Sequence, residues 1–256
     1  MAAGVLAPAP AVATPVSINL AGTCSTECNT DGTDGNARVY TFLDGLGLSS
    51  RVRVTAWSAT QNTSTGALSN WQTGFVGQYQ GGGLGVTNRN EGDGSSNNGH
   101  TMDNSSGIDF LVFHFDGDVV ATGADLNAYA MTISGSSGKD TDASFYIGSS
   151  TVAFGTSINM ANTTQRLSAT NRYIDTTGPG SDNYRNFNTT TEYKGNVLII
   201  AASVGDYMRS GGGNRADSFK VQSIKVEYPI PAPEPAAIGL FGLGVLGLGL
   251  RRRRRG

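Results

Sequence analysis

Short apolar stretches alternate with clusters of Gly, Asn, Asp and Ser along residues 14–228. Each stretch has the length of a β-strand, and no window in this region sustains the apolar period of an amphipathic helix. The pattern therefore predicts an all-β body, which we expect to be a jelly-roll-like β-sandwich. The clearest predicted strands are residues 51–57, 110–115, 128–133, 144–147, 197–203 and 219–228.

In three of these strands the apolar pattern also predicts which faces are buried or where the strand is irregular. In residues 51–57, apolar and polar side chains alternate, which is typical of a strand with one buried face. Residues 110–115 are apolar on both faces and therefore predict a central strand, in which His114 is a packed histidine rather than a ligand. In the last strand the apolar positions change parity, so we expect a β-bulge near Gln222 or Ser223.

The composition agrees with a β-rich body. Of the 256 residues 36 are Gly, and the 20 acidic residues comprise 15 Asp and only 5 Glu. Asp and Gly favour turns, whereas Glu favours helices. The residue content therefore supports many turns and argues against long exposed helices.

The C-terminal end has a different character from the body. Residues 236–250 contain no charged or polar side chain, and Arg251, Arg252, Arg253, Arg254 and Arg255 follow directly. As a helix the apolar run spans roughly 22 Å, which is short of a bilayer core of about 30 Å. Clustered arginines stay on the cytoplasmic side of a membrane, so we expect the body to lie on the other side. A buried core helix is the alternative, although five terminal arginines argue against it.

The order of three features at this end is more specific than any one of them. Pro233, Glu234 and Pro235 precede the apolar run, and the arginine cluster follows it. This order resembles the PEP-CTERM sorting signal of Gram-negative bacteria. The resemblance implies that an exosortase, an integral membrane enzyme, is the partner of this chain. It also implies an inner-membrane-anchored precursor, processing near Pro-Glu-Pro, and a mature form at the cell surface or outside the cell.

The N-terminal residues fit an export signal only in part. Ala11-Val12-Ala13 is a small-residue sequence of the kind that signal peptidases cleave, but residues 1–10 contain no Lys or Arg. We interpret residues 1–13 as a remnant or truncated signal peptide, with a flexible Ala/Pro leader as the alternative. The expected organisation is then residues 1–13, a β-sandwich surface domain at 14–228, and a Pro linker with the sorting signal at 229–256.

Cys24 and Cys28 are the only cysteines of the chain. In an exported protein, two cysteines at this spacing predict a local disulfide. A disulfide that closes such a short ring adds little to stability. We therefore expect it to hold the N-terminal strand in place rather than to stabilise the whole fold.

A second resemblance concerns the body. Gly-Leu-Gly-Val-Thr-Asn at 83–88, His-Thr-Met-Asp-Asn at 100–104 and Val-Thr-Ala-Trp-Ser at 54–58 resemble the exosortase-dependent surface proteins called XDP1. This resemblance implies that the chain is a cargo protein of the exosortase sorting system, and it indicates no mechanism for the body.

Oxygen-bearing side chains are densest around the same segments. Glu91, Asp93 and Asp109 lie on expected turns at a strand entry, in the same region as Asp103 and Asn104, and Asp217 begins the last strand. Ca²⁺ takes six to eight oxygen ligands, so calcium is the one cofactor that this region favours. The ligands selected are Asp103, Asn104, Asp109 and Asp217. The alternative is that these residues only form turns and cap strand ends.

The sequence indicates no enzyme. It carries no nucleophile elbow, no zinc-protease motif and no phosphate-binding loop. Acid pairs such as Asp116 and Asp118, or Asp103 and Asp109, have the residue types of a glycosidase, but such pairs arise by chance among 20 acidic residues.

Binding to exopolysaccharide is the main alternative to a structural or adhesive role. Carbohydrate-binding sandwiches stack aromatic rings on sugars, and Trp57 and Trp71 are the candidates, followed by Tyr79 and Tyr184. A place in the core is the commoner position for such rings. Without the five terminal arginines, 13 basic and 20 acidic residues leave a net charge of −7, which disfavours nucleic acid as a partner.

Overall fold

The computed structural model describes residues 15–26, 33–62, 65, 67–91, 99–105, 107–133, 136–162, 172–176, 183–187, 194–204 and 217–228. The chain divides into two compact units, and the body, Ala13–Tyr228, is one of them. The other unit, residues 1–12 and 229–256, lies outside the described residues. Within the described part of the chain, no helix is long and apolar enough to cross a membrane.

The body is built from antiparallel strands, which confirms the all-β prediction. Their bounds are β1 Val16–Asn19, β2 Ala37–Leu43, β3 Ser49–Gln61, β4 Leu68–Thr73, β5 Phe75–Tyr79, β6 Gly83–Thr87, β7 Met102–Asp103, β8 Ile108–Ala128, β9 Ala130–Ile133, β10 Ser136–Lys139, β11 Ala143–Gly148, β12 Arg172–Thr176, β13 Asn183–Asn186, β14 Lys194–Ala202 and β15 Ser218–Glu227.

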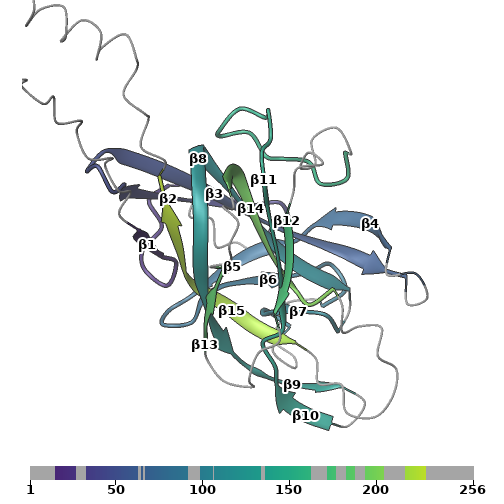
Figure 1. Ribbon diagram of the computed structural model, residues 1–256. Helices are drawn as coiled ribbons and strands as arrows, with labels where there is room; N and C mark the ends of the chain where they lie inside the picture. The colour runs from purple at the N-terminus through teal and green to yellow at the C-terminus, as the bar shows by residue number, and fades with distance from the viewer. Residues whose placement is uncertain are drawn as a thin grey trace, which may run out of the picture. The chain divides into compact units, whose positions relative to one another are not determined.

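One long strand, β8, organises the body (Figure 1). Its first half pairs with β3 on one side and β14 on the other, and its second half pairs with β15 and β13. Thirteen strands therefore join a single hydrogen-bonded sheet, while β9 and β10 form a separate hairpin. The sheet curls nearly into a barrel, so the expected sandwich of two separate sheets is replaced by one sheet that folds over on itself.

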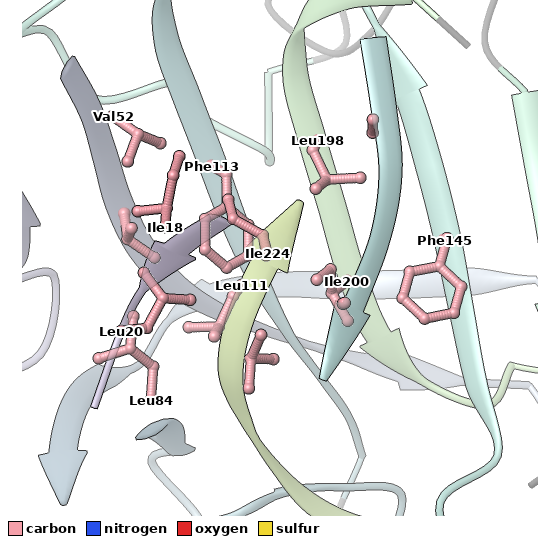
Figure 2. Close-up of a cluster of buried hydrophobic side chains, with 14 of the residues drawn as sticks. Ile18, Leu20, Val52, Leu84, Leu111, Phe113, Phe145, Leu198, Ile200 and Ile224 are labelled. Atoms are coloured by element: carbon pink, nitrogen blue, oxygen red, sulfur yellow. The ribbon is translucent and has the colours of Figure 1, made fainter. Parts of the chain in front are cut away.

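The main hydrophobic core fills the inside of this curl (Figure 2). Leu111 and Phe113 on β8 are completely buried there, together with Ile200 on β14, Ile224 on β15 and Val52 on β3. These residues alternate along their strands with residues of the other face, as the two-residue period of a strand requires. Burial of this apolar surface is the main favourable contribution to folding.

A second core lies on the opposite face of β3 and β8. It contains Trp57 and Phe110 with Val112, and the segment 149–162 contributes Ile158 and Met160. Both faces of residues 110–115 are therefore buried, which confirms the central strand. The prediction that residues 51–57 have only one buried face is wrong, because this second core and the loop over it cover the other face.

The structure confirms the predicted bulge in β15, but β8 continues beyond the end of the strand predicted at residues 110–115. The register of β15 against β8 shifts between Val221 and Ser223, which confirms the predicted bulge. His114 is buried, as expected of a packed histidine. The Asp-Gly-Asp sequence at 116–118 does not end the strand. It is exposed or half-buried where β8 passes from one half of the sheet to the other.

Two glycines of β6 explain part of the Gly-Leu-Gly sequence. A Cβ atom on Gly85 would lie 2.1 Å from the carbonyl oxygen of His100, and one on Gly83 would lie 2.2 Å from that of Val221. Gly83 also has a φ of 97°, which side chains rarely adopt. The glycines thus allow β15 and the segment before β7 to approach β6 closely.

Candidate functional site

Three carboxylates meet where β6, β7 and β8 come together. Glu91 follows β6, Asp103 ends β7 and Asp109 is the second residue of β8. Each offers one oxygen atom, and these three atoms lie within 4.8 Å of one another. We call these residues the acidic triad.

Asn88 holds two members of the triad in place. Its backbone N–H donates to Oε2 of Glu91 over 2.8 Å, and its side-chain Nδ2 donates to Oδ1 of Asp109 over 3.0 Å. The side-chain oxygen of Asn88 accepts from the backbone N–H of Asn90 at 2.9 Å, which closes the turn. One buried asparagine therefore connects the end of β6 with the start of β8.

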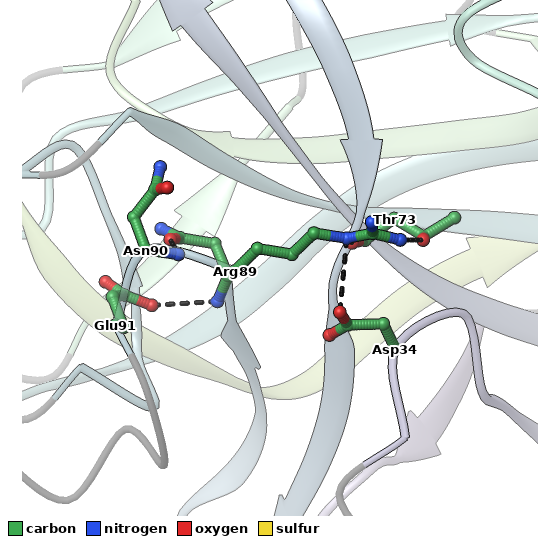
Figure 3. Close-up of polar contacts among 6 residues, drawn as sticks. Asp34, Thr73, Arg89, Asn90 and Glu91 are labelled. Carbon is green, nitrogen blue, oxygen red and sulfur yellow. Dashed lines mark hydrogen bonds and ion pairs between the residues drawn. The ribbon is translucent and has the colours of Figure 1, made fainter.

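The turn that carries Glu91 is also held in place by Arg89, which contacts residues outside the triad (Figure 3). Nη2 of Arg89 donates to Oγ1 of Thr73 at 2.9 Å, and Nε of Arg89 forms an ion pair with Asp34 at 3.1 Å. Both charged side chains are partly exposed, so this pair adds little to stability. Its effect is to define the position of the turn, and with it the position of Glu91.

Strand pairing positions the other two carboxylates. Asp103 lies opposite Ser218 in the β7–β15 ladder, and Asp109 lies opposite Ser58 in the β3–β8 ladder. Oδ1 of Asp103 accepts two hydrogen bonds from Ser105, at 2.8 Å from the backbone N–H and 2.6 Å from the hydroxyl. Asp103 and Asp109 are both fully buried, whereas Glu91 is half-buried.

Each triad carboxylate has one oxygen without a partner outside the triad. Oε1 of Glu91, Oδ2 of Asp103 and Oδ2 of Asp109 are buried and accept no hydrogen bond from other residues. Within the triad, the side chains of Glu91 and Asp103 share a hydrogen bond. In the part of the chain that the structure describes, no Lys or Arg forms an ion pair with them. Buried carboxylates left in this way cost free energy unless they are neutralised.

Burial and mutual repulsion govern the protonation of the triad. Burial, and then the neighbouring Asp103, raises the pKa of Glu91 to about 9. Complete burial, and then Asp103 and Glu91, holds the pKa of Asp109 well above its ordinary value of 3.8. Burial also raises the pKa of Asp103. Without a cation the triad is therefore expected to retain protons at neutral pH that free carboxylates would release.

A second acidic group lies nearby but has partners. Asp140, Asp142 and Asp217 also offer oxygen atoms within 4.8 Å of one another. Oδ2 of Asp217 accepts from Nδ2 of Asn104 at 2.6 Å and from the backbone N–H of Ser203 at 3.1 Å.

This second group also has a counter-charge. The carboxylates of Asp142 and Asp140 act on the pKa of Arg185, which burial lowers. That guanidinium, itself buried, donates to the carbonyl oxygen of Thr141 at 2.8 Å. The second group therefore has a positive charge near two of its carboxylates and hydrogen-bond donors at the third.

The structure separates the four residues predicted to bind calcium. Asp103 and Asp109 come together, but with Glu91, which is not among the four predicted ligands. Asp217 belongs to the second group, and Asn104 is hydrogen-bonded to it through both its side-chain amide and its side-chain oxygen. Asp93 lies outside the described residues.

A buried lysine, Lys220, is a further unusual group that the sequence analysis did not single out. It is 1 % exposed, and its Nζ lies 3.5 Å from the ring centroid of Tyr129 and 4.4 Å from that of Tyr79. Burial lowers its pKa to about 8. The signal in the sequence was a lysine within the apolar run Phe-Lys-Val of the last strand.

The two tryptophans predicted to stack on sugars have partners within the protein. Trp57 is 5 % exposed and belongs to the second core, so its ring is not available to a ligand. Trp71 is half-buried and packs edge-on against Phe110, with ring centroids 5.3 Å apart. Tyr79 packs against His100 and Lys220, and Tyr184, at 38 % exposure, lies near Lys225.

The remaining predicted residues are placed as follows. Asp116 forms an ion pair with Arg51 at 3.2 Å on the surface, at the exposed turning point of β8. Cys24 is disulfide-bonded, and Cys28, the only other cysteine of the chain, lies outside the described residues. The predicted sorting residues Pro233, Glu234 and Pro235, the expected helix and Arg251–Arg255 also lie outside them.

Comparison with known proteins identifies the C-terminal end. Residues 231–254 match the model of the PEP-CTERM protein-sorting motif. This confirms the motif recognised in the sequence, and it implies that the chain is exported and sorted to the cell surface by an exosortase. No curated protein and no solved structure matches the chain.

Proposed function

We propose, from the PEP-CTERM motif at residues 231–254, that this chain delivers its β-rich body to the cell surface, where the body has a structural or adhesive role. The motif is the single observation that carries the proposal. The exosortase is the processing partner, and an inner-membrane-anchored precursor precedes the mature form. Processing near Pro233-Glu234-Pro235 would remove the apolar run and the arginines, and leave a body of net negative charge.

The proposal includes no catalytic step. The sequence contains none of the nucleophile, zinc-protease or phosphate-loop motifs that mark the common enzyme classes. The triad has two of its three carboxylates fully buried. That burial suits a role within the fold better than contact with a polymeric substrate.

The sorting proposal is tested by the mass of the mature protein. In the native host, the surface fraction is expected to contain a form that lacks residues 236–256, measured by intact mass spectrometry. A variant with Pro233→Ala, Glu234→Ala and Pro235→Ala is expected to stay in the membrane fraction at full mass. Pro229→Ala, in the same linker but outside the matched residues, serves as the control and should be processed normally. Full-length protein at the surface would overturn the proposal.

The role of the body is tested separately with a deletion strain. Loss of the gene is expected to reduce cell adhesion or matrix cohesion, and the wild-type chain should restore it. The triple variant should not restore it, because its body stays at the inner membrane. Normal adhesion and cohesion in the deletion strain would contradict the structural or adhesive role while leaving the sorting result untouched.

A further inference from the structure

We propose that Glu91, Asp103 and Asp109 form a binding site for a hard divalent cation, and that Ca²⁺ is its occupant. The site joins three segments that are distant in sequence: the turn after β6, the end of β7 and the start of β8. The inference goes beyond surface sorting, and the site itself does not depend on it.

The first argument is that three carboxylates lie close together although no Lys or Arg of the described residues forms an ion pair with them. Three carboxylates offer oxygen atoms within 4.8 Å of one another, and two of the side chains are fully buried. Like charges this close repel strongly in a medium of low dielectric constant. The fold nevertheless holds them together through Asn88 and Ser105, both of which hydrogen-bond to carboxylate oxygens. Such support fits oxygens that are positioned for a ligand.

The second argument is the set of unpartnered oxygens. Oδ2 of Asp109 belongs to a fully buried side chain and accepts no hydrogen bond. Oδ2 of the fully buried Asp103 and Oε1 of the half-buried Glu91 accept none from residues outside the triad. Buried polar atoms in proteins are almost always paired, so an unpaired set at one point indicates a missing ligand. A cation would satisfy all three oxygens at once.

The neighbouring acidic group provides an internal comparison. Asp140, Asp142 and Asp217 converge just as closely, but Arg185 supplies a positive charge there, and Asn104 and Ser203 donate hydrogen bonds. The second group thus has an arginine and hydrogen-bond donors close to it, whereas no Lys or Arg of the described residues forms an ion pair with the triad. The difference assigns the metal to the triad.

The ligand chemistry selects the ion. Every atom that the triad offers is a carboxylate oxygen, which suits Ca²⁺ and Mg²⁺ rather than softer metals. Mg²⁺ gives up its water reluctantly and keeps several water ligands, whereas Ca²⁺ accepts a protein cage with irregular geometry. Because Asp103 and Asp109 are fully buried, the site favours the ion that loses its water more easily.

A bound ion at the triad would stabilise the fold of the body. The ion would fasten β6, β7 and the start of β8 to one another, close to the central strand that both cores share. Calcium sites of extracellular modules have dissociation constants of about 10⁻⁴ to 10⁻³ M. If the body reaches the surface as proposed above, such a site would fill there, so that the body gains its full stability only after export.

The test uses the purified full-length chain in mild detergent after treatment with a chelator. Ca²⁺ is added during calorimetric titration and during thermal unfolding followed by circular dichroism. We expect one bound ion per chain and a rise in melting temperature of roughly 5 °C or more at 5 mM Ca²⁺ for a dissociation constant near 10⁻⁴ M. Mg²⁺ at the same concentration should give less than half of this rise.

Two variants locate the site. Asp109→Asn keeps the shape of the side chain but cannot ionise, so it should lose the response to Ca²⁺ while it still folds without Ca²⁺. Asp142→Asn, in the second acidic group, is the matched control and should keep the response. If Asp109→Asn does not fold, Glu91→Gln, a change at the half-buried member, replaces it and should weaken binding at least tenfold.

The outcomes are decisive in both directions. No heat and no shift in melting temperature for the wild type would overturn the proposal. So would an undiminished response in folded Asp109→Asn or Glu91→Gln protein, or a response that Asp142→Asn abolishes while Asp109→Asn retains it. Loss of the response in the triad variants alone, with retention in the control, supports it.

Discussion

Raising the pH from 7 to 9.5 should change the stability of this protein through one buried lysine, Lys220. The side chain is 1 % exposed and its ammonium group lies between the rings of Tyr79 and Tyr129. Aromatic faces attract a cation, but they replace its lost hydration only in part. Burial accordingly lowers the pKa of Lys220 from its ordinary 10.5 to about 8.

The sign of the effect follows from proton binding in the two states. Between pH 8 and pH 10.5, Lys220 in the unfolded chain still holds its proton, while the native protein has released it. The unfolded state then binds more protons, so the free energy of unfolding rises with pH in this window. From the two pKa values, the gain between pH 7 and pH 9.5 is about 2 kcal/mol.

The perturbation that isolates this effect is Lys220→Met, which keeps an unbranched side chain and removes the charge. Urea unfolding is followed by the fluorescence of the chain at pH 7.0, 8.0 and 9.5 for both proteins. The difference in unfolding free energy, wild type minus variant, should rise by about 2 kcal/mol over this range. Tyr40 and Tyr228, whose pKa values burial raises to about 12, titrate above the window and do not contribute.

A matched variant on the same strand is Lys225→Met. Its side chain is only partly buried and its Nζ lies 5.2 Å from the ring centroid of Tyr184, so this variant is the control for removing a lysine charge from the same strand. If the wild type and Lys220→Met follow parallel curves from pH 7 to pH 9.5, the ammonium group is not desolvated in the native protein and the reasoning fails.

Three further predictions concern the core and the close contacts of the sheet. Phe113→Ala removes a completely buried ring from the main core and should lower the free energy of unfolding by about 3 to 5 kcal/mol in urea titrations. Gly85→Ala should destabilise the body by more than about 1 kcal/mol, because the added Cβ would lie 2.1 Å from a carbonyl oxygen. Gly117→Ala, whose Cβ would lie 3.7 Å from the ring of Tyr228, should change little. Burial lowers the pKa of His114, so wild-type stability should fall as the pH drops below about 6.5, and His114→Leu should remove that loss in melting curves between pH 7 and pH 5.

Local sequence predicts only some of the residues of the candidate site. The density of Asp, Asn and Gly between residues 81 and 118 indicated oxygen ligands in the right region, and two members of the triad were selected from it. Glu91 could not be preferred over its neighbours, because its position depends on a turn that Arg89 fastens to Thr73 and Asp34. Asp217 could not be assigned to the second group, because Asp140 and Asp142 come close to it only through the folding of the sheet.

The pattern along the chain predicted the clearest apolar strands and where the chain is sent, but it did not predict other strands such as β1, β2 and β6. The two-sided apolar run at residues 110–115 required a central strand, and the change of parity in the last strand required a bulge, because a strand alternates its faces with a period of two. The sorting motif is likewise a linear signal, which its partner reads from the order of residues.

Tertiary structure alone decided which carboxylates meet and which strand faces are covered. The Asp-Gly-Asp sequence at 116–118 has the appearance of a break, but β8 continues through it because β14 pairs with residues on both sides of it, at 110–114 and at 119–120. Trp57 is buried in the second core, to which β4, β8, β14 and the segment 149–162 all contribute side chains. The triad exists because β6, β7 and β8 converge, and such long-range contacts depend on the packing of the whole sheet, which no local pattern encodes.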